Sequence, residues 1–243
     1  MTESNWMKIW IRDTTLWLMQ LVPSWRRQLE KGPRVDGMTR YKYQPGLTFL
    51  PDYWGGGCFP QVYCVPNSCK GFDEEVASVA FTDDVIFANH KQGLLKIVIL
   101  VDGVEEIPEA RAALSDITRL SRGDLRSEEA TFIVQRLSES TATQSDAPCS
   151  LNVSNDHTDV YRIASGTVFA ESKLCRDRPK PQYYEAYHLK TEMRGKRFVI
   201  LRPDRFVFAA CNTKKELEQA VNRISQVLDG LELTSQRDPE SKL

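Results

Sequence analysis

The segment from Leu94 to Val101 restricts the fold of this chain more than any other stretch of its sequence. It reads Leu-Leu-Lys-Ile-Val-Ile-Leu-Val, an apolar run interrupted by a single lysine. A run of this length and composition is typical of a strand that is buried on both faces, as strands are in sheets covered by helices. We therefore expect an α/β protein whose central sheet contains residues 94–101.

The end of the chain predicts a β-hairpin followed by a helix. Residues 197–201 and 206–210 are two apolar runs, and the turn-forming residues 202–205 join them. Thr213 and Glu216 have the spacing of a helix capping box, and an apolar face continues from there to Gly230. These elements place a hairpin and a capped helix at the end of the domain.

The middle of the chain supplies further elements. Pro108 is predicted to open a helix that Gly123 ends. Apolar residues at three- and four-residue steps predict another short helix over residues 127–138, and the apolar run 85–88 predicts a strand. Strands that alternate with helices in this way favour a central mixed sheet flanked by helices.

An amphipathic helix is predicted at the amino terminus, over residues 5–22. Trp6, Trp10 and Trp17 lie on its apolar stripe, which is expected to contact a partner because exposed apolar surface commonly marks an interface. The stripe ends at Pro23 after fewer than the roughly 20 residues that span a bilayer. No membrane partner is expected, and the absence of a secretory signal predicts a cytoplasmic protein.

Charge and cysteine spacing argue against several functions. The chain has 32 Lys and Arg against 33 Asp and Glu, so nucleic acid is not an expected partner. No two of the six cysteines have C-x2-C spacing, so we expect reduced thiols and no metal site. The glycine triplet at 55–57 lacks the strand and the third glycine of a dinucleotide fingerprint, and it is expected to form a backbone turn.

Two segments are expected to lie outside the folded core. Residues 138–159 are dominated by Ser, Thr, Asp and Asn, and they predict an exposed polar insert. Residues 236–243 are expected to form a disordered tail. The expected organisation is a helical segment over residues 1–45 and an α/β domain over residues 46–235.

Candidate acid–base groups are few. His188 lies beside Tyr187 and Tyr184 in the segment Tyr-Tyr-Glu-Ala-Tyr-His, and these three residues are the candidates for catalysis. His90 and His157 are expected at the surface. No spacing of a nucleophile and a base accompanies any of them.

Three segments are distinctive: residues 46–52 (Gly-Leu-Thr-Phe-Leu-Pro-Asp), residues 81–87 (Phe-Thr-Asp-Asp-Val-Ile-Phe), and the hairpin 198–208 with its Arg-Pro-Asp turn. They resemble segments of phenol-hydroxylase-type, FAD-dependent aromatic monooxygenases of fungi. The resemblance covers roughly residues 40–230. It implies that residues 46–235 form the thioredoxin-like carboxy-terminal domain of that family, which lacks redox cysteines and serves packing and dimerisation. Residues 1–45 would then be the end of the catalytic domain.

In that family the flavin is held by an amino-terminal glycine-rich fingerprint and a later Gly-Asp motif. This sequence has neither in a usable position, since Gly123-Asp124 is expected to be a turn, so no FAD-binding residue is assigned. FAD and NADPH are implied only for a full-length relative.

The resemblance therefore implies a truncated relative of such a monooxygenase, associated with the oxidation of aromatic or polyketide secondary metabolites. Its partner would be a second copy of the chain or a flavin monooxygenase. Two alternatives are a non-catalytic dimerisation or accessory module, and a cofactor-free cyclase or isomerase of a biosynthetic cluster.

Overall fold

The computed structural model describes residues 6–22, 25, 40–44, 47–69, 71–136, 159–176 and 184–237. The chain divides into two compact units, residues 1–39 and residues 40–243. Of the expected polar insert at 138–159, only Asp159 is among the described residues. Of the expected tail at 236–243, residues 236 and 237 belong to the last helix, and the rest lies outside the described part.

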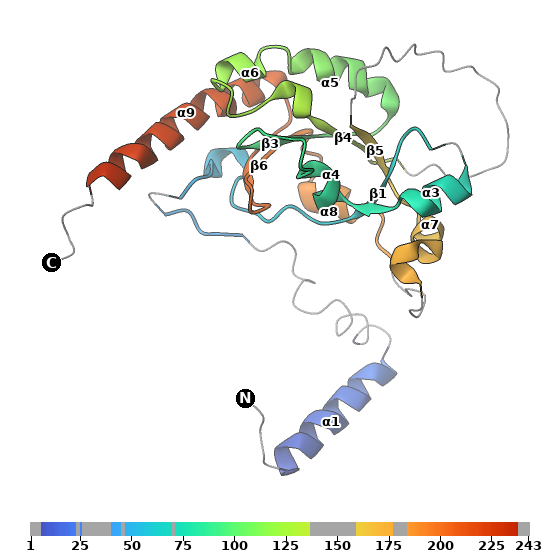
Figure 1. Cartoon of the computed structure of the whole chain (residues 1–243). Helices are drawn as coiled ribbons and strands as arrows, with labels where there is room; N and C mark the ends of the chain where they lie inside the picture. Colours follow the sequence, from blue (N-terminus) through green and yellow to red (C-terminus); the bar gives the residue numbers. More distant parts are fainter. Residues whose placement is uncertain are drawn as a thin grey trace. The chain divides into compact units, whose positions relative to one another are not determined.

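The second unit is built on a seven-stranded mixed sheet with the strand order β2-β1-β5-β4-β3-β6-β7 (Figure 1). The central strands β3, β4 and β5 are parallel, and the pairs β3–β6, β6–β7, β1–β5 and β1–β2 are antiparallel. The strands are β1 Tyr63–Pro66, β2 Ala80–Phe81, β3 Lys96–Val101, β4 Thr131–Val134, β5 Val160–Ile163, β6 Phe198–Leu201 and β7 Val207–Cys211.

Helices connect and cover these strands. The α-helices of the second unit are α3 Phe72–Ser78, α4 Thr82–Ile86, α5 Ile107–Ala113, α6 Ile117–Leu120, α7 Gly166–Glu171, α8 His188–Met193 and α9 Lys214–Arg237. Short 3₁₀ helices are η2 Pro51–Tyr53, η3 Val104–Glu106, η4 Ser127–Glu129 and η5 Lys173–Cys175. Figure 1 shows α5, α6 and α9 on one face of the sheet and α8 on the opposite face.

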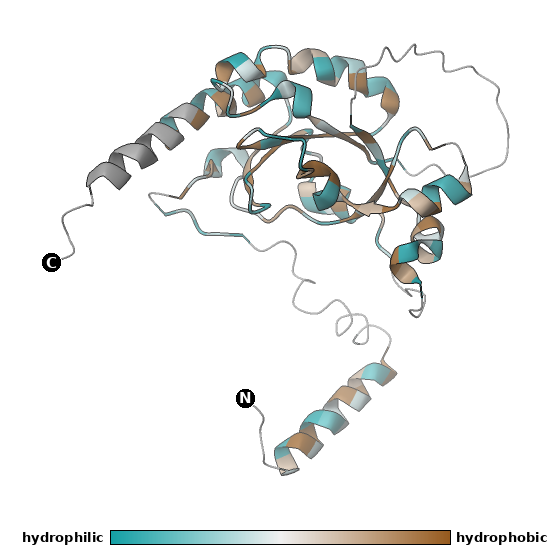
Figure 2. Ribbon diagram, in the orientation of Figure 1, coloured by the Kyte–Doolittle hydropathy of each residue, from teal (hydrophilic) through white to brown (hydrophobic). Residues whose placement is uncertain are grey.

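Strand β3 forms the centre of the core, as its sequence predicts. All six of its residues are buried. Ile97 and Ile99 pack in one cluster with Ile117 of α6 and Leu217 and Val221 of α9. The apolar colouring of the central strands in Figure 2 follows from this burial by helices on both faces.

Two sequence-based predictions in this unit are wrong. The apolar run 85–88 is not a strand, because residues 82–86 form α4, where Asp83 and Asp84 in the first turn suit the positive end of the helix dipole. The described residues 127–136 do not form the predicted α-helix, because Thr131–Val134 is the buried strand β4. A short apolar run bounded by polar residues fits either element, and its neighbours in the sheet decide between them.

The predicted carboxy-terminal elements are confirmed. Strands β6 and β7 pair as an antiparallel hairpin, with a register irregularity at Ile200 and Leu201. Thr213 accepts a hydrogen bond from the backbone N–H of Glu216 at 3.2 Å, as a capping box requires. Helix α9 continues beyond Gly230 to Arg237.

The segment before β1 forms the expected turn at the glycine triplet. Trp54 and Gly56 have positive φ angles, 59° and 88°. A Cβ atom on Gly55 would lie 2.5 Å from the carbonyl oxygen of Phe208, so the backbone approaches β7 too closely for a side chain. This contact fixes residues 50–57 against the hairpin.

The first unit contains the predicted amino-terminal helix, α1 Trp6–Leu21. Apolar and polar residues both occur along it (Figure 2), and none of its residues is buried. No helix in the described ranges combines the length and the apolar character needed to cross a bilayer.

Candidate functional site

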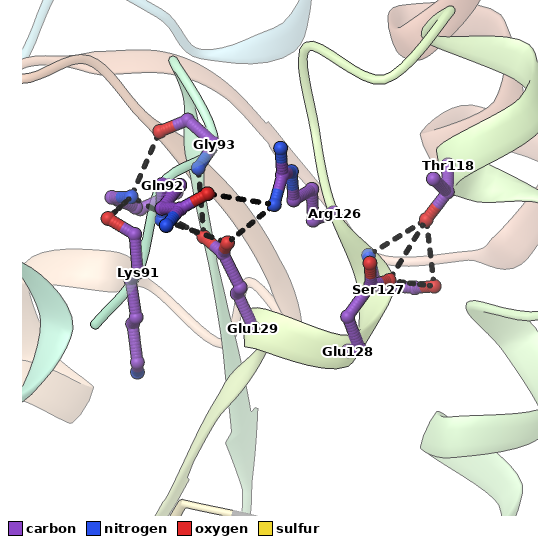
Figure 3. Close-up of polar contacts among 9 residues, drawn as sticks. Lys91, Gln92, Gly93, Thr118, Arg126, Ser127, Glu128 and Glu129 are labelled. Atoms are coloured by element: carbon purple, nitrogen blue, oxygen red, sulfur yellow. Dashed lines mark hydrogen bonds and ion pairs between the residues drawn. The ribbon is translucent and has the colours of Figure 1, made fainter.

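The starts of three neighbouring parallel strands bring buried and half-buried polar groups together. Lys96 is the first residue of β3, Thr131 is the first residue of β4, and Asp159 directly precedes β5. Because the three strands are parallel, their starts lie at the same edge of the sheet. The loop that contains Lys91 and Gly93 lies beside this edge (Figure 3). We call Lys91, Lys96, Glu129, Thr131 and Asp159 the lysine cluster.

Lys91 is the most enclosed member of the lysine cluster. Its side chain is 1% exposed, and its Nζ atom lies 2.6 Å from Oδ2 of Asp159. The same Nζ donates a hydrogen bond of 2.6 Å to Oγ1 of Thr131. Burial lowers the pKa of Lys91, while the hydrogen bond and charge of Asp159 oppose that shift. Nε2 of the exposed His90 lies 3.6 Å from the same oxygen of Asp159.

Lys96 and Glu129 hold the loop in front of the strands. Nζ of Lys96 donates to the carbonyl oxygens of Lys91 and Gly93, each at 2.8 Å, and lies 3.4 Å from Oε2 of Glu129. The Glu129 carboxylate accepts the backbone N–H groups of Gln92 at 2.7 Å and Gly93 at 2.9 Å. Burial would raise the pKa of Glu129, but these two hydrogen bonds and Lys96 lower it below its ordinary value.

A second set of hydrogen bonds in Figure 3 connects Thr118 of α6 with Ser127 and Glu128 of η4. Oγ1 of Thr118 accepts the backbone N–H of Ser127 at 2.9 Å and lies 2.8 Å from the Ser127 hydroxyl. Oε2 of Glu128 accepts from both hydroxyls, at 3.3 and 3.4 Å. These contacts fix the turn that leads into β4.

The lysine cluster has the composition of a catalytic site but a closed geometry. A buried amine with a lowered pKa can act as a base or a nucleophile. The amine of Lys91 is already directed at Thr131 and Asp159, and its side chain is almost completely covered. In addition, ligands of such sheets bind at the carboxyl ends of parallel strands, whereas this cluster lies at the amino ends. We interpret it as a structural network.

The residues predicted for catalysis have three different environments. The hydroxyl of Tyr184 donates to the carbonyl oxygen of Ala164 at 2.7 Å, its ring stacks on Phe169, and burial raises its pKa. Tyr187 is 55% exposed. His188 begins α8, and its Nδ1 atom lies 4.0 Å from Oε2 of Glu185. The Tyr184 hydroxyl is therefore committed to the backbone and is not free to assist His188.

The residues predicted to form an interface all lie on α1. The exposed fractions of Trp6, Trp10 and Trp17 are 75%, 62% and 61%. At 3.6 residues per turn these three side chains fall within about 40° of the helix circumference. The three indoles therefore lie on one exposed side of the helix, where Asp13 separates Trp10 from Trp17, and we call this side the tryptophan face.

In the described part of the chain, the cysteines form no disulfide, and the possible metal ligands do not group into a site. Cys58, Cys64, Cys69, Cys175 and Cys211 are free thiols. No three His, Cys, Asp or Glu side chains are grouped so as to hold a metal ion within the described ranges. Gly123, proposed from the sequence to form a turn, has a positive φ of 92°.

No protein-family model, curated protein or solved structure matches this chain.

The sequence did not predict the lysine cluster. Lys91 and Asp159 are distant in the sequence, and no spacing motif connects them. The one available signal was Lys96 within the apolar run of β3, because a lysine inside a buried strand requires a polar partner.

Proposed function

We propose that this chain is a thioredoxin-like accessory module related to the carboxy-terminal part of phenol-hydroxylase-type, FAD-dependent aromatic monooxygenases. In this proposal it acts in the cytoplasm in the oxidation of fungal aromatic or polyketide metabolites. Its contribution is assembly, and the tryptophan face contacts a second copy of the chain or a flavin monooxygenase. The flavin and NADPH chemistry belongs to that enzyme.

The strand order supports the thioredoxin-like part of the proposal. Strand β3, helix α5 and strand β4 form a parallel β-α-β unit, and β6, β7 and α9 form a hairpin with a helix. The sheet order β4-β3-β6-β7 joins these two units through the antiparallel pair β3–β6. A thioredoxin-like domain is expected to have this order of strands, with a helix such as α8 between the two units. Strands β1, β2 and β5 extend the sheet beyond it.

The cysteine environments support a role without redox chemistry. A thioredoxin carries its reactive cysteine pair after the first strand of the β-α-β unit, and here residues 102–105 read Asp-Gly-Val-Glu. Burial raises the pKa of Cys64 and that of Cys211, each to about 12. A redox-active thiol needs a lowered pKa instead, because the thiolate is the reactive form.

The observation that carries the assembly role is the tryptophan face. Three exposed indoles on one helix are costly in water, and aromatic side chains of this kind are enriched at the centres of interfaces. The polar residues Lys8, Arg12 and Thr15 lie on the opposite side of α1 and provide a reference face for a test of this role.

Light scattering on two triple variants tests this role. In the first, Trp6, Trp10 and Trp17 become alanine. In the second, Lys8, Arg12 and Thr15 become alanine, which removes the same number of side chains from the opposite face. We expect the wild type and the second variant to be dimers, or to bind a flavin monooxygenase in a mixing experiment. The first variant is expected to have the mass of a monomer and to bind no flavin monooxygenase. Identical masses for all three proteins, with the tryptophan emission of a solvated indole, would contradict the proposal.

A second experiment separates the module from a complete enzyme. The purified chain is expected to bind no stoichiometric FAD and to oxidise no NADPH, because a flavin enzyme needs a binding site that orients its cofactor. Absorbance near the flavin bands after desalting is the measurement. A yellow protein that consumes NADPH would overturn the assignment.

A further inference from the structure

A hollow of about 590 Å³ lies between α3 and the segment formed by α7 and η5. Val76, Ala77 and Ala170 give it apolar walls. Beneath it lies a small core of buried residues, against which Val76, Leu174 and Cys175 pack; the core residues are Val65, Val79, Ala164, Val168 and Phe169. Its size is within the range of small-molecule sites, roughly 300–1,000 Å³. We call it the α3–η5 groove.

The η5 side of the groove carries two cations. Lys173 and Arg176 both line the groove, and within the described part of the chain neither side chain has an ion pair or hydrogen bond. Cys175 lies between them and is half-buried, so its thiol reports on access to the groove. The hydroxyl of Ser172 donates to the carbonyl oxygen of Phe169 at 2.7 Å and so is already used within the chain.

Two carboxylates limit the charge of any occupant. Asp73 of α3 and Glu171 of α7 also line the groove. A dianion would meet these carboxylates, whereas a single carboxylate can lie at Lys173 and Arg176, with an apolar body on the alanines and valine. Charge complementarity of this kind selects the sign and the orientation of a ligand more than its affinity.

We propose that the α3–η5 groove binds a small amphipathic monoanion, an aryl or alkyl carboxylate. Its carboxylate pairs with Lys173 and Arg176, and its apolar part covers Val76, Ala77 and Ala170. No residue of the groove belongs to the tryptophan face. A test of ligand binding in the groove is therefore separate from a test of the assembly role.

Alkylation of Cys175 by iodoacetamide tests the proposal on the full chain. Peptide mapping by mass spectrometry follows the labelling rates of Cys175 and of Cys58, which lies outside the groove. The probe is 3-phenylpropanoate, and its neutral amide is the control ligand. The anion is expected to slow labelling of Cys175 at least about fivefold at saturation without changing Cys58, and the amide is expected to protect it less.

Two charge-matched variants complete the test. Lys173→Gln with Arg176→Gln should weaken protection by the anion about tenfold or more, which corresponds to about 1.4 kcal/mol. Lys214→Gln with Lys215→Gln removes the same charge from α9 and should leave protection unchanged. Equal protection in both variants, equal protection by the amide, or no effect of the anion on Cys175 would each overturn the proposal.

Discussion

Lys91 is the residue whose environment departs most from what its type predicts. Lysine is almost never fully buried without a partner, and the cost of burial here is offset by Asp159 and Thr131. The sequence could indicate that Lys96 needs a polar partner, but it could not indicate that Asp159 returns to the same edge. That proximity is created by the parallel pairing of β4 and β5.

Replacing Lys91 by methionine should destabilise the protein by about 3 kcal/mol, because it leaves the carboxylate of Asp159 without its buried partner. Urea unfolding at neutral pH is the measurement. The double variant Lys91→Met with Asp159→Asn should recover part of this loss, since it removes the unpaired charge. If the double variant loses the sum of the stabilities lost by Lys91→Met and Asp159→Asn alone, the two residues are not coupled.

Glu129 should make stability depend on pH in the acid range. Its pKa in the folded state lies below the ordinary pKa of a glutamate. The stability that Glu129 contributes is therefore fully present above the ordinary pKa, and it is lost as the pH falls through the folded-state pKa. Glu129→Gln should cost about 2 kcal/mol at neutral pH, because it weakens hydrogen bonds to a charged acceptor. The difference from the wild type should narrow as the pH falls below about 4.5, the ordinary pKa of a glutamate side chain. A constant difference across that range would contradict this account.

At the scale of single elements, the sequence predicted best where capping, turn and periodicity signals agree. The hairpin β6–β7 and the start of α9 satisfy all three signals, and they are confirmed. One detail differs, because the Glu216 carboxylate accepts the backbone N–H of Asn212 at 2.7 Å, one residue before the expected Thr213. By contrast, α4 and β4 were assigned to the wrong type because a few apolar residues fit both periods.

Thr213→Ala should destabilise the protein by about 1 kcal/mol, because it removes the side-chain cap from α9. Thermal unfolding followed by circular dichroism measures the change. Thr213→Ser keeps the accepting hydroxyl and should stay close to the wild type. If serine is as damaging as alanine, the methyl group rather than the cap is responsible.

Gly56 should tolerate no side chain. Its φ of 88° is unfavourable for other residues, and a Cβ atom would lie 2.8 Å from the Phe49 ring. Gly56→Ala should therefore cost about 2 kcal/mol. The matched control is Gly71→Ala, where a Cβ atom meets nothing within 4 Å. Denaturant midpoints of the two variants should differ clearly, and equal midpoints would exclude strain at Gly56.

At the scale of the whole molecule, the chain behaves as two compact units divided between Thr39 and Arg40. Among the described residues, the buried core lies in the second unit, in which β3 and the helices on either face bury the apolar residues. The sequence predicted an α/β domain preceded by an amino-terminal helix, and both are confirmed. The order of the strands was not predictable, because it depends on contacts between residues that are distant in the chain.

A fragment that begins at Arg40 should unfold at the same temperature as the full chain, within about 2 °C, because the first unit contributes no described residue to the core. Differential scanning calorimetry on both proteins is the measurement. A midpoint lowered by more than about 5 °C would mean that residues 1–39 stabilise the second unit.

The backbone contacts of residues 50–59 have a consequence for how this protein can meet others. Strand β7 is the last strand of the sheet, and its residues Val207 and Phe208 exchange hydrogen bonds with Leu50, Gly56 and Gly57. At the other side β2 has two residues and leads directly into α4. Within the described part of the chain, neither border of the sheet offers a long row of free peptide groups, which disfavours edge-to-edge aggregation and the addition of a peptide strand at these borders. At the two borders of this sheet, contacts with another protein are therefore expected to be made by side chains.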